Sequence, residues 1–242
     1  MSESEPSRAE KASRSEKARR TLVMWDIDRT LLHGGGVTAR AWKAAFAELT
    51  GLEWRETPQF GGRTDLDICA EVFRVHGVTD HTAESFFDLY LRRIEHDRHL
   101  FAEQGALMPG VREVLSRLAA DPRIVQTLVT GNLAPVARAK VEAFGLHDVF
   151  DEEIGGYGGD HAVRATLVRR SLERAHDKYA EPFRAVVVGD TVNDVAAALA
   201  NDVAVVGVAT GSTTAAELHH AGAEAVLPDL SDVDHAVRTI AG

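Results

Sequence analysis

The sequence has a single cysteine and no long apolar run, and both absences narrow the class of protein. One thiol, Cys69, cannot form an internal disulfide or supply a cysteine-based zinc cluster. No apolar run approaches the ~18 residues that a membrane-spanning helix needs. Positive charge is also scarce, because 27 Lys and Arg stand against 37 Asp and Glu, for a formal net charge of −10. Such a surface repels nucleic-acid backbones and anionic membranes, so we expect a cytoplasmic protein that binds neither.

The chain of 242 residues is 45% hydrophobic and 26% charged, which is enough apolar material to bury a sizeable core. Residues 1–20 are the exception, because they combine Ser, Glu, Lys and Arg with almost nothing to bury. This composition predicts a disordered tail. The tail lacks the apolar segment of a signal peptide, and its glutamates argue against a transit peptide.

Short apolar runs alternate with helical patterns along the rest of the chain. The runs are continuous rather than alternating in hydrophobicity, as strands buried on both faces are, and they lie at 22–27, 125–129, 185–188, 203–208 and 225–227. Apolar side chains recur at helical spacing in 111–120 and in 133–144, where Asn132 can cap the start and Gly145 the end. The alternation predicts an α/β fold, a Rossmann-like parallel sheet with helices on both faces.

Between the first and second of these strands lie roughly ninety residues with helical patterns but no good strand. We expect Thr38, Thr64 and Thr82 each to begin a helix in this segment, and Gly51 to end the first. An all-helical insertion of this length is a small domain of its own. The predicted organisation is therefore a helical domain at 34–104 and a core built from 21–33 and 105–242.

Two aspartates, Asp26 and Asp28, stand where the first strand ends. Ligands of open α/β sheets bind outside the carboxyl ends of the strands. Two carboxylates placed there repel each other near pH 7 unless a cation or a proton separates them. One can be a nucleophile that forms an acyl phosphate, and the other a general acid and then a base. The alternative is that the two aspartates have only a structural role, one as a helix cap and the other as a turn residue.

Two further strand ends carry side chains suited to a ligand. Thr130-Gly131-Asn132 follows the second strand and offers a hydroxyl, an approachable backbone and the free N–H groups of the next helix. These groups suit a phosphoryl oxygen, although they are also ordinary turn and cap residues. Gly189-Asp190-Thr191-Val192-Asn193-Asp194 follows the strand at 185–188. Its oxygen ligands, with no His or Cys among them, favour Mg²⁺.

Together the three strand ends resemble the haloacid dehalogenase superfamily. Its hallmarks are Asp-x-Asp-x-Thr after the first strand, Thr or Ser after the second, and Gly-Asp-x-x-x-Asp after the fourth. Here they read Asp26-Ile27-Asp28-Arg29-Thr30, Thr130 and Gly189 to Asp194, and the resemblance runs from about residue 21 to the C-terminus. The helical insertion directly after the first motif is similar to the cap domain of the phosphoglycolate-phosphatase-like branch.

The resemblance implies a role for each matching residue. Asp26 attacks phosphorus, while Asp28 protonates the leaving oxygen and then activates water. Mg²⁺ is held by Asp26, the backbone carbonyl of Asp28 and Asp190, with Asp194 or Asn193 in support. Thr130 matches the family's second motif and is a candidate catalytic residue, and Thr130, Gly131 and Asn132 are also our candidates for binding the substrate. The second aspartate favours phosphate-ester chemistry, because the superfamily's dehalogenases lack that acid.

Two positions depart from the family pattern. Arg29 stands where this branch usually has glycine, and its side chain either points to solvent or meets an anionic substrate at the entrance. The usual lysine of the third motif is missing, since Lys178 comes too late in its helix. Arg164 lies where that cation is expected, and arginine can bridge two oxygens while staying charged, although a structural salt bridge is the alternative.

Weaker signals come from other segments. Arg63, in a loop before a helix of the insertion, either binds a distal anionic group of the substrate or is an exposed turn residue. Residues 155–159 are rich in glycine without a dinucleotide fingerprint, and we expect a flexible loop. His96 and His99, like the pair His219-His220, fit a solvated face better than a metal site.

The sequence therefore favours a Mg²⁺-dependent phosphatase that acts on a small phosphorylated metabolite, phosphoglycolate-like or a sugar phosphate, through an aspartyl-phosphate. Two alternatives stay open: a phosphosugar mutase on the same scaffold, and a non-catalytic protein that binds a phosphorylated ligand. A monomer and a dimer are both compatible with the sequence.

Overall fold

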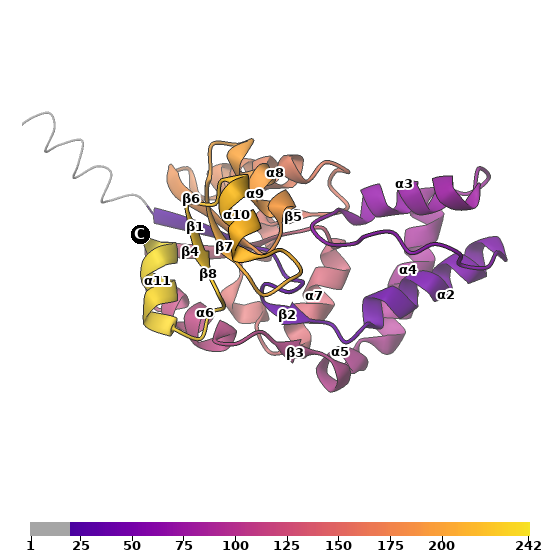
Figure 1. Cartoon of the computed structure of the whole chain (residues 1–242), viewed down its shortest axis with the longest axis horizontal. Helices are drawn as coiled ribbons and strands as arrows, with labels where there is room; N and C mark the ends of the chain where they lie inside the picture. Colours follow the sequence, from indigo (N-terminus) through magenta and orange to yellow (C-terminus); the bar gives the residue numbers. More distant parts are fainter. Residues whose placement is uncertain (1–19) are drawn as a thin grey trace, which may run out of the picture.

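The computed structural model describes residues 20–242, and its centre is a six-stranded parallel sheet (Figure 1). The strand order is β5-β4-β1-β6-β7-β8. The strands are β1 (Arg20–Trp25), β4 (Ile124–Thr130), β5 (Gly156–Tyr157), β6 (Phe183–Gly189), β7 (Ala204–Val208) and β8 (Ala225–Leu227). The chain lays β4 and β5 on one side of β1 and then returns to lay β6, β7 and β8 on the other. This change of direction creates the crevice at the carboxyl end of β1 in which ligands of such sheets bind.

Helices cover both faces of the sheet, as the alternation in the sequence predicted. Successive side chains of β1 point to opposite faces, so Val23 and Trp25 lie in one apolar cluster and Leu22 and Met24 in another. The first face is covered by α6 (Val111–Ala119), α7 (Ala134–Ala143) and α11 (Val233–Ala241). The second is covered by α8 (Arg164–Tyr179), α9 (Val192–Leu199) and α10 (Ala215–Ala221). Two short 3₁₀ helices, η1 (His147–Val149) and η2 (Glu152–Ile154), precede β5.

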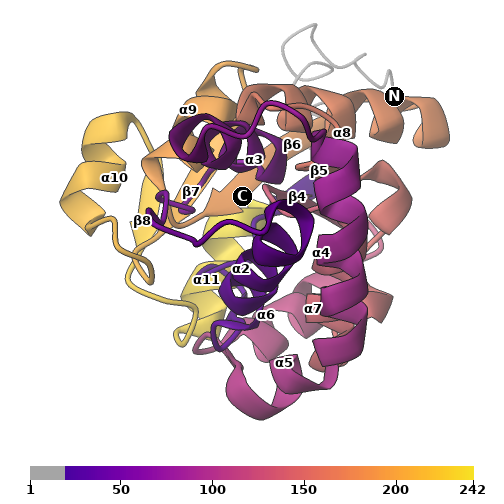
Figure 2. The same ribbon diagram turned by 90° about the vertical axis from the view of Figure 1, so that its right-hand side faces the viewer.

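The insertion after β1 forms a helical cap that stands beside the sheet in Figure 1 and lies in front of it in Figure 2. Its helices are α2 (Val37–Thr50), α3 (Asp65–His76), α4 (Ala83–Asp97) and α5 (His99–Gln104). The two-residue strands β2 (Leu32–His33) and β3 (Ala106–Leu107) pair antiparallel where the chain leaves and re-enters the core. Aromatic rings hold the cap together, with the Trp42 and Phe86 centroids 4.7 Å apart. Val136 and Ala139 of α7 belong to the same apolar cluster, so the cap packs on a core helix.

The helix starts show which predicted caps are right. Thr64 accepts a hydrogen bond from the Asp67 N–H, and Thr82 forms a capping box with Ser85, as expected. The prediction for Thr38 is wrong, because α2 begins earlier, after Gly36 in a left-handed conformation with φ 77°. The prediction that Asn132 caps the following helix is also wrong, because Leu133 is the N-cap of α7 and no side chain caps that end, while the Asn132 amide donates to Asp28 and Thr130 instead.

Residues 155–159 are not the loop that was predicted. They contain β5, which pairs with the end of β4, and Gly156 and Gly158 have no room for a side chain. A Cβ on Gly158 would lie 1.8 Å from the carbonyl oxygen of Gly131. The glycines here permit one backbone segment to pack closely on another. From composition alone, such a close-packed segment cannot be distinguished from a flexible one.

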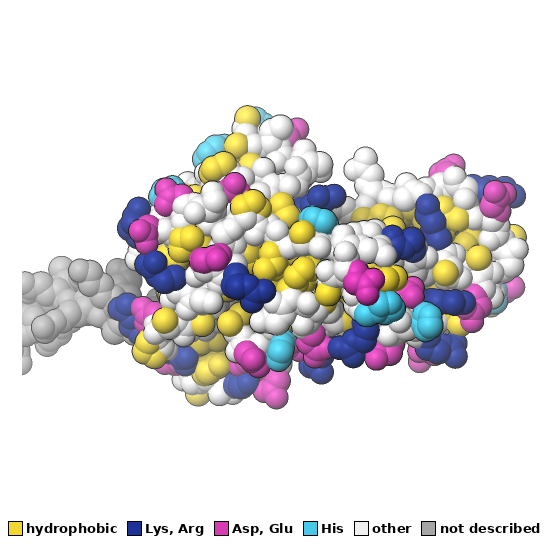
Figure 3. All heavy atoms as spheres, turned by 90° about the horizontal axis from the view of Figure 1, so that it is seen from below, with side chains coloured by type: hydrophobic (Ala, Val, Ile, Leu, Met, Phe, Trp, Pro, Cys, Tyr) yellow, Lys and Arg dark blue, Asp and Glu magenta, His cyan; other side chains and the backbone are white. Residues whose placement is uncertain are grey.

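The tail expected at 1–20 lies outside the described residues, apart from Arg20, which begins β1. Within residues 20–242, none of the helices combines the length and the apolar character that crossing a bilayer requires. Acidic and basic side chains are interspersed over the face seen in Figure 3.

Candidate active site

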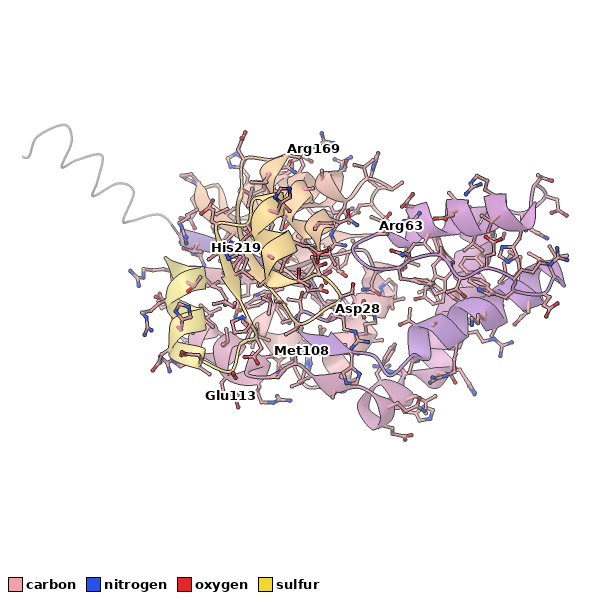
Figure 4. The ribbon with its side chains drawn as sticks, viewed as in Figure 1. Asp28, Arg63, Met108, Glu113, Arg169 and His219 are labelled. Atoms are coloured by element: carbon pink, nitrogen blue, oxygen red, sulfur yellow. The ribbon has the colours of Figure 1, made fainter. Side chains whose placement is uncertain are left out.

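The carboxyl ends of β1, β4 and β6 open into a cavity of about 850 Å³ between the core and the cap. Asp28 lies at this junction, and Arg63 comes to it from the cap side (Figure 4). Core residues in the wall include Asp26, Thr130, Asn132, Arg164 and Asp190, while the cap adds Gly61, Gly62 and Asp65. The strand ends that carry the sequence motifs therefore share one cavity.

Three aspartates form the most buried acidic group of the site. Asp26, Asp190 and Asp194 are 6%, 3% and 1% exposed, and each places one carboxylate oxygen within 4.8 Å of the others. Asp194 is fixed by a capping box at the start of α9, where Thr191 accepts from its N–H and donates to its Oδ2 over 2.6 Å. Burial and then mutual repulsion raise the pKa values of Asp26 and Asp190 above the usual range.

This group fits a divalent cation of the Mg²⁺ type. All its donors are hard carboxylate oxygens, and a positive ion between them would relieve the repulsion that raises their pKa values. The backbone of Gly211 packs closely against the carboxylate of Asp190, because a Cβ on Gly211 would lie 1.8 Å from Oδ2 of Asp190. His96, His99, His219 and His220 are exposed on the surface, in agreement with the sequence reading.

Arg164, the first residue of α8, lies among these carboxylates. Its Nη2 is 2.6 Å from Oδ1 of Asp26 and 2.6 Å from Oδ1 of Asp194, and the residue is 8% exposed. Burial by itself would lower the pKa of Arg164, but the charges of Asp194 and Asp26 outweigh it and raise the pKa above its ordinary value. Lys178 instead pairs with Asp151 and Glu153, at 2.8 and 2.7 Å, outside the cavity. The structure thus brings Arg164, and not Lys178, to the site.

Asp28 has a partner that sequence reasoning missed. Lys140 of α7 donates to Oδ1 and Oδ2 of Asp28 at 2.7 and 2.6 Å and to Oδ1 of Asn132 at 2.8 Å. The side-chain amide of Asn132 also donates to Asp28, over 2.8 Å. Enclosure in the cavity raises the pKa of Asp28, but the Lys140 charge and these hydrogen bonds outweigh it and bring the pKa below its usual range.

A signal for Lys140 was present in the sequence. It follows Val136 and Ala137 at helical spacing, on the apolar face of a helix that starts directly after the Thr130-Gly131-Asn132 motif. A lysine is almost never fully buried unless it is paired. A lysine on that face therefore required a carboxylate at the nearby strand ends.

At the end of β4, the sequence predicted that a ligand can approach the backbone of Gly131, and the structure places the cap there instead. Thr130 is completely buried, and its hydroxyl accepts from the Asn132 amide over 2.8 Å. The space above Gly131 is taken by the cap, because a Cβ there would lie 1.8 Å from the carbonyl oxygen of Arg63. The glycine admits the cap backbone, and its own carbonyl accepts from the Asp65 N–H at 2.8 Å.

The two remaining arginines differ in what they contact. The guanidinium of Arg63 is held by Asp67, at 2.6 Å, and by Glu71 on helix α3, so the structure does not bring its charge to the aspartate cluster. Arg29 lines the cavity and is exposed, and within residues 20–242 its side chain makes no hydrogen bond or ion pair. Its backbone is left-handed, with φ 68°.

Comparison with known proteins supports the reading of the strand ends. The sequence model of one family, described as haloacid dehalogenase-like hydrolases, matches residues 21–202. A search of curated proteins found no match.

Solved structures with the same architecture cover nearly the whole chain. A predicted phosphatase from Clostridium acetobutylicum is 18% identical with a TM-score of 0.69, over 92% of this chain and 100% of that one. A hydrolase from Pseudomonas syringae is 21% identical with a TM-score of 0.64, over 92% and 100%. CbbY from Rhodobacter sphaeroides, in complex with phosphate, is 20% identical with a TM-score of 0.63, over 88% and 96%. At these identities the likeness establishes the fold.

Proposed function

The chain belongs to the haloacid dehalogenase-like hydrolases, and from that membership we propose that it is a Mg²⁺-dependent phosphatase acting through an aspartyl-phosphate. One observation carries the proposal: Asp26, Asp190 and Asp194 converge within 4.8 Å at the same sheet edge as Asp28 and Arg164. A nucleophile, a candidate acid, a cation and a metal-type ligand set therefore share one cavity.

The first half of the reaction transfers the phosphoryl group to the protein. A carboxylate oxygen of Asp26 attacks phosphorus, the ester P–O bond breaks, and Asp28 gives a proton to the departing oxygen. Because Lys140 favours the ionised form of Asp28 in the free protein, that proton arrives with the substrate. A phosphate monoester supplies it readily, since its second pKa lies near ~6.

The second half restores the enzyme. Asp28 takes a proton from water, the resulting hydroxide attacks the phosphorus held on Asp26, and the bond between phosphorus and the Asp26 oxygen breaks. Inorganic phosphate leaves with the proton that Asp28 took from water, and both Asp26 and Asp28 are again carboxylates. Arg164, hydrogen-bonded to Asp26 and ion-paired with Asp194, keeps the nucleophile oriented and adds positive charge beside the phosphoryl oxygens.

Asp26, Asp190 and Asp194 would hold Mg²⁺, together with the backbone carbonyl of Asp28. When bound, the ion supplies positive charge that offsets the repulsion between an anionic nucleophile and an anionic phosphate.

The cavity suits a small phosphorylated metabolite, phosphoglycolate-like or a sugar phosphate. Its volume of about 850 Å³ is in the range of small-molecule sites, and residues of the cap form part of its wall.

The test is phosphate release from a panel of phosphorylated metabolites, with and without Mg²⁺, by wild type and Asp26→Asn. We expect metal-dependent release that falls by about 10³-fold or more in the variant, because the nucleophile is lost. Asp148→Asn, which changes an aspartate that is 88% exposed, should retain activity as the matched control. Equal activity in Asp26→Asn and wild type would exclude the mechanism.

The same panel separates the two alternatives raised by the sequence. A mutase returns the phosphoryl group to a sugar and releases little phosphate, so it is detected by the isomeric sugar phosphate. A binding protein turns over none of the esters at any Mg²⁺ concentration.

A further inference from the structure

We propose that Lys140 is a positioning residue that fixes the carboxylate of Asp28 for proton transfer, an inference that rests on the proposed function. Lys140 is 1% exposed and lies 112 residues from Asp28 in the sequence, on helix α7. Its position on the apolar face of α7 indicates a buried ion pair but no part in the reaction, and its contacts are what point to one.

The ammonium of Lys140 is fully engaged within the protein. It has three N–H donors, and three acceptor oxygens surround it: Oδ1 and Oδ2 of Asp28 and Oδ1 of Asn132, at 2.7, 2.6 and 2.8 Å. No donor is left over for an oxygen of the substrate. Lys140 is therefore distinct from Arg164, whose contacts are with Asp26 and Asp194.

Asp28 needs such an anchor because little else confines its side chain. The carboxylate group is 48% exposed toward the cavity, so apolar packing does not fix its rotamer. The backbone around it is held in a tight turn, in which the Arg29 N–H donates to the carbonyl of Leu32 over 2.7 Å, but these bonds do not set the side-chain rotamer of Asp28. A donor pair from Lys140 and one hydrogen bond from Asn132 hold both carboxylate oxygens in a single orientation.

The anchor itself stands on a rigid part of the molecule. Lys140 is in the body of α7, flanked by buried Val136, Ala137 and Val141, and that helix packs against both the sheet and the cap. Precise placement of a catalytic group is worth much in rate, because a displacement of about 1 Å can cost ~10²-fold. The fold thus uses α7 to fix a side chain that the backbone turn after β1 does not fix by itself.

The experiment compares two leaving groups in wild type and Lys140→Met. An alkyl phosphate from the panel releases an alkoxide that must be protonated, whereas p-nitrophenyl phosphate releases a stable phenolate that needs no acid. We expect Lys140→Met to lower kcat/KM by about 10²-fold for the alkyl ester and by only a few-fold for the aryl ester. kcat/KM is the right quantity, because it reports the steps up to transfer of the phosphoryl group.

A role confined to stability would lower kcat/KM equally for both esters, and that result overturns the proposal. Lys178→Met is the matched control, since Lys178 pairs with Asp151 and Glu153 away from the cavity and both rates should persist. On the alkyl ester, the double variant Asp28→Asn with Lys140→Met should have nearly the same kcat/KM as Asp28→Asn alone. Independent, additive losses would also contradict the proposal.

Unfolding measurements keep the test separate from the proposed function. In a cycle of Lys140→Met, Asp28→Asn and the double variant, the two changes should be coupled, with the double variant more stable than the separate losses predict. If wild type hydrolyses neither ester, the proposed function fails, and the role of Lys140 in catalysis fails with it. Activity in wild type with no coupling and no leaving-group dependence in Lys140→Met rejects the Lys140 proposal alone.

Discussion

Arg29 occupies a backbone conformation that few residues with a side chain adopt. Its φ of 68° is left-handed, and its N–H donates to the carbonyl of Leu32 over 2.7 Å to close a tight turn. A left-handed conformation costs a residue with a Cβ roughly 1–2 kcal/mol. Glycine adopts this conformation without that cost, so this chain carries an arginine here at a cost in stability.

We therefore expect Arg29→Gly to be about 1 kcal/mol more stable than Arg29→Ala, because both remove the guanidinium and only glycine relieves the backbone. Urea unfolding of the two variants under identical conditions gives the comparison. A pair of equal stability would show that the turn carries no conformational cost.

The sequence identified residues that are close along the chain better than residues that meet only in the fold. Asp26 with Asp28, and Asp190 with Asp194, stand out because each pair belongs to one short motif after one strand. Lys140 went unrecognised because its partner is 112 residues away, and only the packing of α7 on the sheet brings them together. The roles of all these residues remain predictions.

At the level of whole elements, the strands were predictable because a doubly covered parallel sheet needs continuous apolar runs. β5 escaped recognition because it is two residues long and one of the two is glycine. β5 forms because its backbone pairs with the end of β4, and a pattern within residues 155–159 alone cannot show this pairing.

Gly158→Ala tests whether β5 is close-packed. Its Cβ would lie 1.8 Å from the Gly131 carbonyl oxygen and 3.0 Å from the Asp65 nitrogen, and neither backbone atom can move aside freely. We expect a loss of about 2–3 kcal/mol in the free energy of unfolding, together with lower activity, because Gly131 follows Thr130 in the site. Gly159→Ala is the control, since its Cβ meets only the end of the Leu133 side chain at 3.2 Å. Equal effects of the two substitutions would mean that the loop is open after all.

At the scale of the whole molecule, the cap is joined to the core by hydrogen bonds as well as by apolar packing. Asp65 donates its N–H to Gly131 and accepts at Oδ2 from the Leu133 N–H, each over 2.8 Å. Thr64 donates to the carbonyl of Ala162 at 2.8 Å, and Asn193 to that of Gly61 at 3.3 Å. The sequence predicted a helical cap, but these contacts join segments far apart along the chain and could not be read from it.

The joint between cap and core contains a carboxyl group that titrates near neutrality. Burial raises the pKa of Asp65 to about 7, with the Asp28 charge adding to it and the Leu133 N–H and Lys140 opposing it. In the unfolded chain an aspartate has a pKa of about 3.9. Between these values the folded protein binds more protons than the unfolded chain, so this group makes the protein less stable as the pH rises, and the loss is complete above the folded pKa.

Asp65→Asn removes this dependence while keeping an oxygen that can accept from Leu133. The variant should match wild type near pH ~4, gain on it as the pH rises to ~7, and then keep a constant advantage on the order of 4 kcal/mol. Urea unfolding of both proteins over this pH range, at fixed Mg²⁺, measures the difference. Asp80→Asn, at an aspartate that is 81% exposed, should leave stability nearly unchanged throughout. An advantage of Asp65→Asn that is constant or shrinks with rising pH would show that Asp65 is ionised in the folded protein, and the joint between cap and core would then hold a permanent negative charge.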